Sequence, residues 1–181
     1  VNVYSQMHKK LIVSKALQLI HSGMFILTSG GTTILELIRA LPPQLRVTIM
    51  TGSIPVINAC MAHPKLEVVV IGDKLSRDSK LTVGAEAIQK ISTVNADLCF
   101  LGTNAIDTQH GLTDNDWEVV QVKKAMVNSA SKVICMTISE KLQTYQPISV
   151  CKIEKIDYLI TELDPSNEAL TPFKEAGVTV I

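Results

Sequence analysis

The sequence predicts an α/β protein with an open, mostly parallel sheet and helices on both of its faces. Apolar runs of strand length alternate along the chain with amphipathic helical patterns. The apolar runs do not alternate with polar residues, which is typical of strands buried on both faces, and helices between them indicate parallel crossovers. The 181 residues are 46% hydrophobic and 19% charged, enough apolar material for one domain spanning residues 1–181.

Local patterns predict each element of the first half. An apolar stripe predicts a helix that ends before Gly23, and a second stripe predicts a helix that ends at the Pro42-Pro43 pair. Ser53 has the residue type of a helix N-cap, and Pro55 suits the first turn. The expected helices are residues 7–22, 34–41 and 53–61, and the expected strands are 24–27, 47–50 and 66–71.

The second half follows in the same way. Asn115 and Glu118 have the spacing of a capping box at the start of a helix that continues to Met126. Gly177 ends the last helix. The expected helices are residues 81–91, 115–126 and 166–176, the expected strands are 98–101, 133–136, 158–161 and 178–181, and the irregular segments that suit site loops are 72–80 and 103–116.

Composition and charge exclude several functional classes. With 17 basic and 17 acidic residues the net charge is zero, so we do not expect the chain to bind DNA or RNA by itself. Residues 1–50 hold five basic residues and one acidic residue, a net of +4, which fits either a solvated helix face or an anion-attracting flank. The chain begins at Val1 rather than Met, which favours a fragment of a longer protein.

Other classes are disfavoured by what the sequence lacks. There is no apolar run long enough for a membrane span and no signal sequence, so we expect a cytoplasmic protein. The four cysteines form no CxxC pair and the four histidines lack metal-ligand spacing, so we expect free thiols and no metal. Neither GxxxxGK[ST] nor a GxGxxG after the first strand is present, so we expect no nucleotide cofactor.

Three predicted strands run into turns that are rich in glycine, serine and threonine. The carboxyl ends of parallel strands share one edge of a sheet, where helix N-termini present unpaired N–H groups to ligands. This combination suits a phosphate or carboxylate, although each turn taken singly also fits a purely structural helix cap. The turns contain Ser29, Gly31, Thr32 and Thr33; Thr51, Gly52 and Ser53; and Gly102, Thr103 and Asn104.

With these motifs, the chain resembles the C-terminal effector-sensing domain of DeoR-type bacterial transcriptional regulators over nearly its whole length. The most specific match is ADLCFLG at residues 96–102, which continues to residues 123–126. More degenerate matches are SGGTT at 29–33, TGS at 51–53, Gly72-Asp73, ISEK at 138–141 and IDYLIT at 156–161. The family has Asp, Asn, Gly and Asp where this chain has Ser29, Gly52, Asp73 and Ile138, which leaves open a different or a lost ligand.

The resemblance implies a sensor that binds a small effector, commonly a phosphorylated sugar. It implies a homo-oligomer, and operator DNA that is read by an N-terminal winged helix-turn-helix absent from this chain. Lys141 is the candidate countercharge for phosphate, or else a plain surface lysine. The expected ligand-binding residues are Ser29, Gly31, Thr32, Thr33, Thr51, Gly52, Ser53, Gly102, Thr103, Asn104, Glu118 and Lys141.

The family's fold is similar to that of ribose-5-phosphate isomerase and the CoA transferases, so an enzyme of either type is the alternative. The isomerases carry an acid where Asn104 stands, and an amide cannot accept a proton at neutral pH. Asp107 and Glu118 either titrate or serve as a loop acid and a helix first-turn acid. No sequence signal marks the nucleophilic glutamate of a transferase. We therefore predict a regulator with no catalytic residue.

Overall fold

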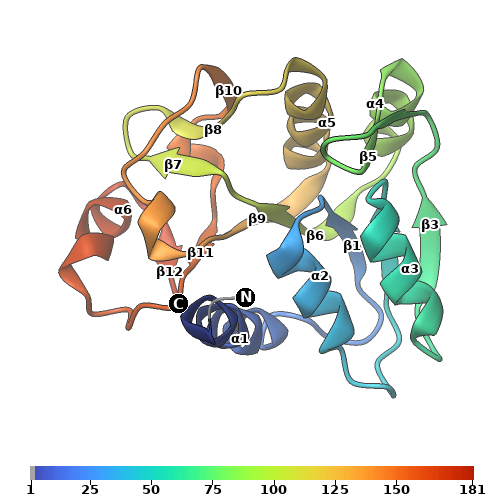
Figure 1. Ribbon diagram of the computed structural model, residues 1–181, viewed down its shortest axis with the longest axis horizontal. Coiled ribbons are helices and arrows are strands. Elements are labelled where there is room, and N and C mark those ends of the chain that lie inside the picture. Colours follow the sequence, from blue (N-terminus) through green and yellow to red (C-terminus); the bar gives the residue numbers. More distant parts are fainter. Residues whose placement is uncertain (1–2) are drawn as a thin grey trace.

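A computed structural model describes residues 3–181 as a three-layer α/β fold (Figure 1). The central sheet of the described residues has seven strands in the order β12-β11-β9-β6-β1-β2-β3, and all neighbours are parallel. This confirms the predicted open parallel sheet. Its strands are β1 Phe25–Thr28, β2 Thr48–Thr51, β3 Glu67–Val70, β6 Ala96–Gly102, β9 Ala130–Met136, β11 Tyr158–Ile160 and β12 Thr179–Val180.

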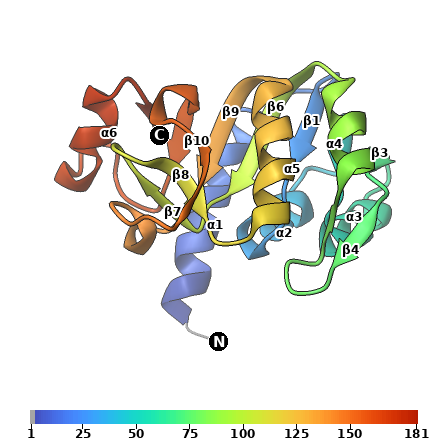
Figure 2. The same cartoon turned by 90° about the horizontal axis from the view of Figure 1, so that it is seen from above.

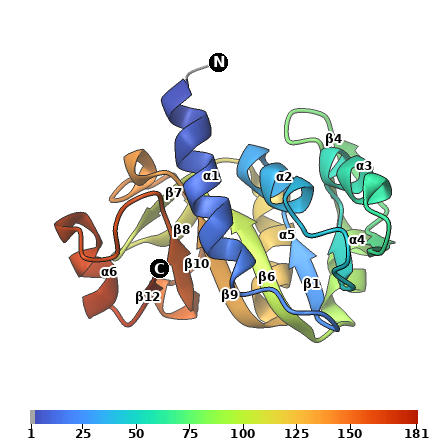
Figure 3. The ribbon, with the colours of Figure 1, turned by 90° about the horizontal axis from the view of Figure 1, so that it is seen from below.

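Helices cover both faces of the sheet because successive strand residues face opposite layers. Ile26 packs into a core with α1, α2 and α3 (Figure 3), and the next residue, Leu27, packs into a core with α4, α5 and α6 (Figure 2). The helices are α1 Val3–Leu17, α2 Thr32–Arg39, α3 Ile54–Ala62, α4 Ala85–Ser92, α5 Trp117–Asn128 and α6 Thr171–Glu175, with 3-10 turns η1 Ser139–Lys141, η2 Ile153–Lys155 and η3 Glu168–Leu170. None of these helices is both long and apolar enough to cross a membrane.

The two segments expected to be irregular contribute strands to two small antiparallel sheets. One is the hairpin of β4 Lys74–Ser76 and β5 Leu81–Val83. The other pairs β8 Gly111–Asp114 with β7 Ala105–Asp107 and with β10 Ile148–Cys151, a strand that the sequence analysis did not predict. These strands have only three or four residues, too few for periodicity to distinguish them from loops.

Several details of the predicted helices are wrong. The first helix is Val3–Leu17 rather than residues 7–22, and the last one, predicted over residues 166–176, is the 3-10 turn η3 followed by the short helix α6. Residues 81–91 are not one helix, because β5 pairs with β4 and Gly84, at φ 129°, turns the chain into α4. The cap of α5 is Asp116 rather than Asn115, since its carboxylate accepts hydrogen bonds from the backbone N–H groups of Glu118 and Val119 at 3.0 and 3.1 Å. A carboxylate one residue after Asn115 accepts from the unpaired backbone N–H groups of the first helical turn. Capping-box spacing alone therefore placed the start of α5 one residue too early.

The strand order changes direction between β1 and β6. From β1 the chain builds outward through β2 to β3, and then crosses to the other side of β1 for β6, β9, β11 and β12. At such a switch point the connections that follow the two neighbouring strands run to opposite faces of the sheet. This opens a crevice outside the carboxyl ends of the two strands. The turns after β1 and β6 meet at this crevice, because Ser29 follows β1 and Gly102 ends β6.

Candidate functional site

A pocket of about 530 Å³ lies outside the carboxyl ends of β6 and β9 and beside the N-termini of α2 and α5. The turns after β1 and β6 both line this pocket and lie side by side. Of the predicted ligand-binding residues, Gly31, Thr32, Thr33, Gly102, Thr103, Asn104 and Lys141 line the pocket. The lining residues that were not predicted include Ser5, Lys9, Asp78, Ser79, Asp114, Asn115, Asp116, Lys123 and Thr137.

The N-terminus of α2 is open toward this pocket. Gly31 is the N-cap at φ 106°, a left-handed conformation that glycine adopts without a steric penalty, and no side chain caps the helix. The carbonyl of Gly31 already accepts the first helical hydrogen bond from the backbone N–H of Leu35. The N–H groups of the first turn therefore have no side-chain acceptor, and they carry the partial positive charge of the helix start.

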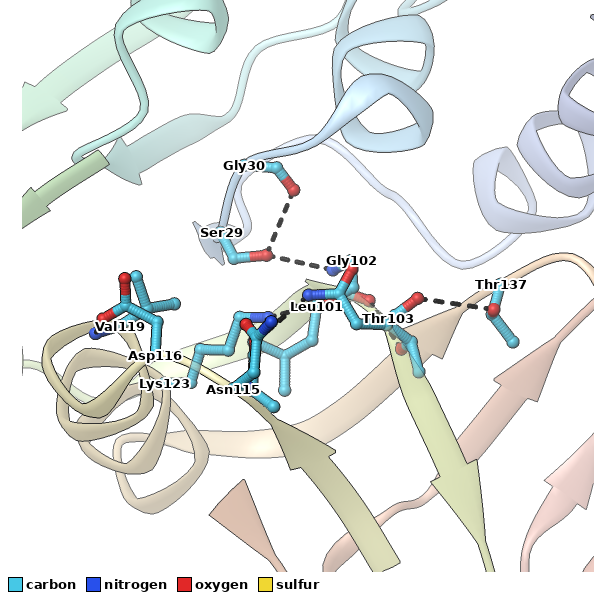
Figure 4. Close-up of polar contacts among 12 residues, drawn as sticks. Ser29, Gly30, Leu101, Gly102, Thr103, Asn115, Asp116, Val119, Lys123 and Thr137 are labelled. Carbon is cyan, nitrogen blue, oxygen red and sulfur yellow. Dashed lines mark hydrogen bonds and ion pairs between the residues drawn. The ribbon is translucent and has the colours of Figure 1, made fainter. Parts of the chain in front are cut away.

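A buried ion pair forms the floor of the pocket. The Nζ of Lys123 lies 3.0 Å from the Oδ2 of Asp114, and these two side chains are only 7% and 4% exposed. Lys123 also donates to the carbonyl of Gly102 at 3.1 Å, and Figure 4 shows it extending from α5 toward that residue. The carboxylate of Asp114 accepts further hydrogen bonds from Asn104 Nδ2 at 3.3 Å and from the backbone N–H of Asn115 at 2.8 Å.

Three lysines and three aspartates line the pocket, and among the described residues only Lys123 and Asp114 of these form an ion pair. Burial by itself raises the pKa of Asp114, but the Lys123 ammonium and three hydrogen bonds outweigh it, so the pKa is lowered and the group stays ionised. Burial lowers the pKa of Lys141, and the positive charges of Lys123 and Lys9 lower it further. Among the described residues neither Lys9 nor Lys141 has a carboxylate within ion-pair distance. An anion would relieve this repulsion.

Ser29 lies behind the pocket wall rather than on it. Its side chain is fully buried, and its Oγ accepts a hydrogen bond from the backbone N–H of Gly102 at 2.9 Å (Figure 4). This bond ties the turn after β1 to the end of β6. Gly102 itself has no room for a side chain, because an added Cβ would lie 2.6 Å from the carbonyl oxygen of Gly30.

The turn after β2 does not reach the pocket, contrary to the expected convergence of three turns. Thr51 is buried, and its hydroxyl donates to the carbonyl of Thr28 at 3.1 Å and accepts from the backbone N–H of Ser53 at 3.1 Å. A Cβ at Gly52 would overlap the hydroxyl of Thr82. The hairpin of β4 and β5 therefore covers this turn, and Thr51, Gly52 and Ser53 serve packing between strands.

The acidic residues considered for catalysis are either outside the pocket or too acidic. Glu118 pairs with Lys74 at 3.3 Å on the surface. Asp107 is buried, which raises its pKa, but hydrogen bonds from His110 lower it further than burial raises it. Asp114 does line the pocket, yet its lowered pKa is far from the value near 7 that a general base requires.

Among the described residues no cysteine lines the pocket. Among residues 3–181 no group of three or more His, Cys, Asp or Glu side chains is placed to hold a metal ion. The four cysteines are free thiols, as predicted, and burial raises the pKa of Cys135 to about 12. These groups therefore belong to the core and not to the site.

Sequence reasoning missed several pocket residues for a common reason: their roles depend on distant partners. Asp114 lies in a segment that was expected to be irregular. Lys123 lies in the match that continues from residues 96–102 to residues 123–126, and no local pattern marks it as a pocket residue. Ser5 and Lys9 precede the apolar stripe of the first helix at helical spacing. Continuing that stripe backward would have indicated that they face inward.

Comparison with known proteins places the chain among regulators. Residues 5–163 match the family described as the DeoR C terminal sensor domain. The HTH-type transcriptional regulator GlpR of Haloferax volcanii is 31% identical over 173 residues, which cover 96% of this chain and 68% of that protein. The putative aga operon transcriptional repressor of Escherichia coli O157:H7 is 27% identical, with 96% and 64% covered. The chain thus spans about two thirds of the length of these relatives.

Solved structures share the fold at low identity. The translation initiation factor eIF-2B of Pyrococcus horikoshii OT3 has a TM-score of 0.61 at 16% identity, with 88% of this chain and 64% of that chain covered. Ribose 5-phosphate isomerase A of Methanocaldococcus jannaschii has a TM-score of 0.54 at 18% identity, with 74% and 53% covered. These similarities confirm the predicted relation to the isomerase fold, and at such identities they establish the fold alone.

Proposed function

We propose, from the premise that this chain belongs to the DeoR family of transcriptional regulators through its sensor domain, that its pocket binds a phosphorylated sugar or a similar small anion. The relatives are named transcriptional regulators and repressors, which supports a regulatory rather than an enzymatic role. In this proposal residues 1–181 form one effector-sensing domain. In the proposal, effector binding to this domain controls how tightly a separate, preceding DNA-binding domain binds operator DNA.

One observation carries the proposal: the open N-terminus of α2 and two unpaired lysines face the same pocket. The backbone N–H groups of the first turn and the Thr33 hydroxyl supply neutral donors for phosphate oxygens. Lys141 supplies the countercharge, and a dianion would raise its lowered pKa again. Asn104 and Asp114 supply an amide and a carboxylate for sugar hydroxyls, next to the phosphate position.

A thermal-shift screen of sugar phosphates beside their unphosphorylated sugars tests the proposal. A ligand that binds only the folded state at a hundredfold excess over Kd stabilises it by about 2.7 kcal/mol. For a domain of this size we expect a rise in Tm of roughly 5–10 °C. Thr33→Val and Lys141→Ala should each reduce that rise, whereas Lys152→Ala, on an exposed site outside the pocket, should leave it unchanged.

Two outcomes would contradict the proposal. Neutral sugars that stabilise the chain as well as their phosphates would remove the role of the anion. A shift that both pocket variants leave intact would place the anion elsewhere on the molecule. Because both substitutions alter groups on the pocket rim and not the apolar core, loss of folding would not be confused with loss of binding.

We also propose that the chain self-associates through α1. Val3, Met7 and Leu11 are 70%, 57% and 48% exposed, and their four-residue spacing aligns them on the outer face of this helix. Contiguous exposed apolar side chains are typical of an interaction surface. A second copy of the chain would bury them by pairing two α1 helices about a two-fold axis, the symmetry that paired operator half-sites require.

A further inference from the structure

We propose that helix α1 is a wall of the ligand pocket, and that a bound anion holds its N-terminal half in place through Ser5 and Lys9. This inference rests on the proposed function and names its regulation. Both residues line the pocket that was described above, although they lie on a helix more than a hundred residues from Lys123 and Lys141 in the chain.

The inner face of α1 changes character along its length. Ser5, Lys9, Ile12 and Ala16 follow one another at spacings of four, three and four residues, so they share one face of the helix. Ile12 and Ala16 are fully buried, but no residue from Val3 to Leu11 is buried. The apolar half of this face packs on the sheet, and the polar half faces the pocket.

The C-terminal half of α1 is firmly anchored. Besides its apolar contacts, the Nζ of Lys15 donates to the carbonyl oxygens of Thr161, Leu163 and Ile181 at 2.8, 2.7 and 3.1 Å. In the N-terminal half no residue up to Leu11 is buried, and Figures 2 and 3 show this half projecting beyond the rest of the fold. Its position is therefore the part of the helix that a ligand can change.

The charges show how an anion would act on this half. Lys9 of α1 and Lys141 of η1 face the same pocket without a carboxylate partner, and the positive charge of Lys9 is one cause of the lowered Lys141 pKa. In the absence of an anion the two ammonium groups repel each other, which favours displacement of α1. A phosphate dianion between them replaces the repulsion with two attractions, and the Ser5 hydroxyl adds a donor.

This arrangement gives a route from the pocket to the preceding domain. In the family the sensor domain is the C-terminal one, so α1 is its element nearest to what comes before. The same half-helix carries the exposed Met7 on its outer face. Fixing the inner face through Lys9 thus also fixes the orientation of the proposed association surface.

Hydrogen exchange of the whole chain tests the inference, with inorganic phosphate as the probe and chloride at matched ionic strength as the control. We expect phosphate to slow amide exchange both in residues 29–33 and in residues 7–12. Lys9→Ala should weaken phosphate binding about tenfold, the loss of one hydrogen bond to a charged group. At phosphate concentrations that saturate the variant, residues 29–33 should stay protected while the protection of residues 7–12 is lost.

Lys10→Ala is the matched control, because Lys10 is the exposed neighbour of Lys9 and does not line this pocket. It should behave as the wild type in both segments. Protection of residues 29–33 without any change in α1, or an equal effect of the two lysine substitutions, would overturn the inference and leave the proposed function standing. If phosphate protects neither segment, the anion site itself is wrong and both proposals fail.

Discussion

Removing the ammonium from the buried pair at the pocket floor should destabilise the fold strongly. Lys123→Met leaves the Asp114 carboxylate buried with two remaining donors, Asn104 and the backbone N–H of Asn115. Breaking one partner of a buried pair costs about 3–5 kcal/mol, and the two remaining donors place this case near 3 kcal/mol. For a chain of this length that loss corresponds to a fall in Tm of roughly 6–12 °C.

The loss of stability caused by Lys123→Met should become smaller as the pH falls. In the wild type the pKa of Asp114 is lowered, so its stabilisation is present above the unfolded pKa of about 3.9 and is lost as the pH falls through the folded value. In Lys123→Met burial dominates and raises that pKa. The ionised carboxylate then destabilises the fold at neutral pH, and the penalty fades as the pH falls. The gap in unfolding free energy between wild type and variant should therefore narrow from pH 7 to pH 4.

Urea unfolding at several pH values, followed by circular dichroism, measures both effects. Lys124→Met is the matched control, since Lys124 is the next residue on α5 and is exposed. Adding Asp114→Asn to Lys123→Met should recover most of the lost stability, because an amide still accepts from Asn104 and Asn115 without a charge. If Lys123→Met is as stable as Lys124→Met, or if its cost is the same at pH 4 and pH 7, the reasoning about the pair is refuted.

Two further predictions concern packing and assembly. Gly102→Ala should destabilise the chain and weaken anion binding, because the added Cβ would lie 2.6 Å from the Gly30 carbonyl oxygen and would force the turns after β1 and β6 apart. Gly72→Ala is the control in the same thermal melts, because Gly72 also lacks a positive φ and an added Cβ there would meet no atom within 4 Å. Light scattering at micromolar concentration should show a dimer or tetramer that Met7→Lys shifts toward monomer. A 19.7 kDa monomer at every concentration would refute association through this domain.

Much of the fold could be predicted because its signals are local. A run of consecutive apolar residues such as 98–101 is typical of a strand buried on both faces, and the helical stripe ending at Leu41 marks the face that packs on the sheet. Short pieces were missed where tertiary pairing overrides pattern. The residues of β5 have helix-compatible apolar spacing, and they form a strand because β4 lies beside them.

The residues of the candidate site also differ in whether local sequence patterns could predict them. Its glycine- and threonine-rich turns follow strands in the sequence, and any parallel sheet brings such turns to one edge, so Gly31, Thr33 and Gly102 could be assigned to the site in advance. The sequence by itself thus determined the layers and the edge of the sheet where the glycine- and threonine-rich turns lie. Only the tertiary structure decided which turn is excluded from the pocket, which carboxylate pairs with Lys123, and that Lys9 and Lys141 line the same pocket. The physical reason is that periodicity and capping report on contacts within a few residues, whereas these contacts depend on the order in which strands pair and on charges that only the closed fold brings together.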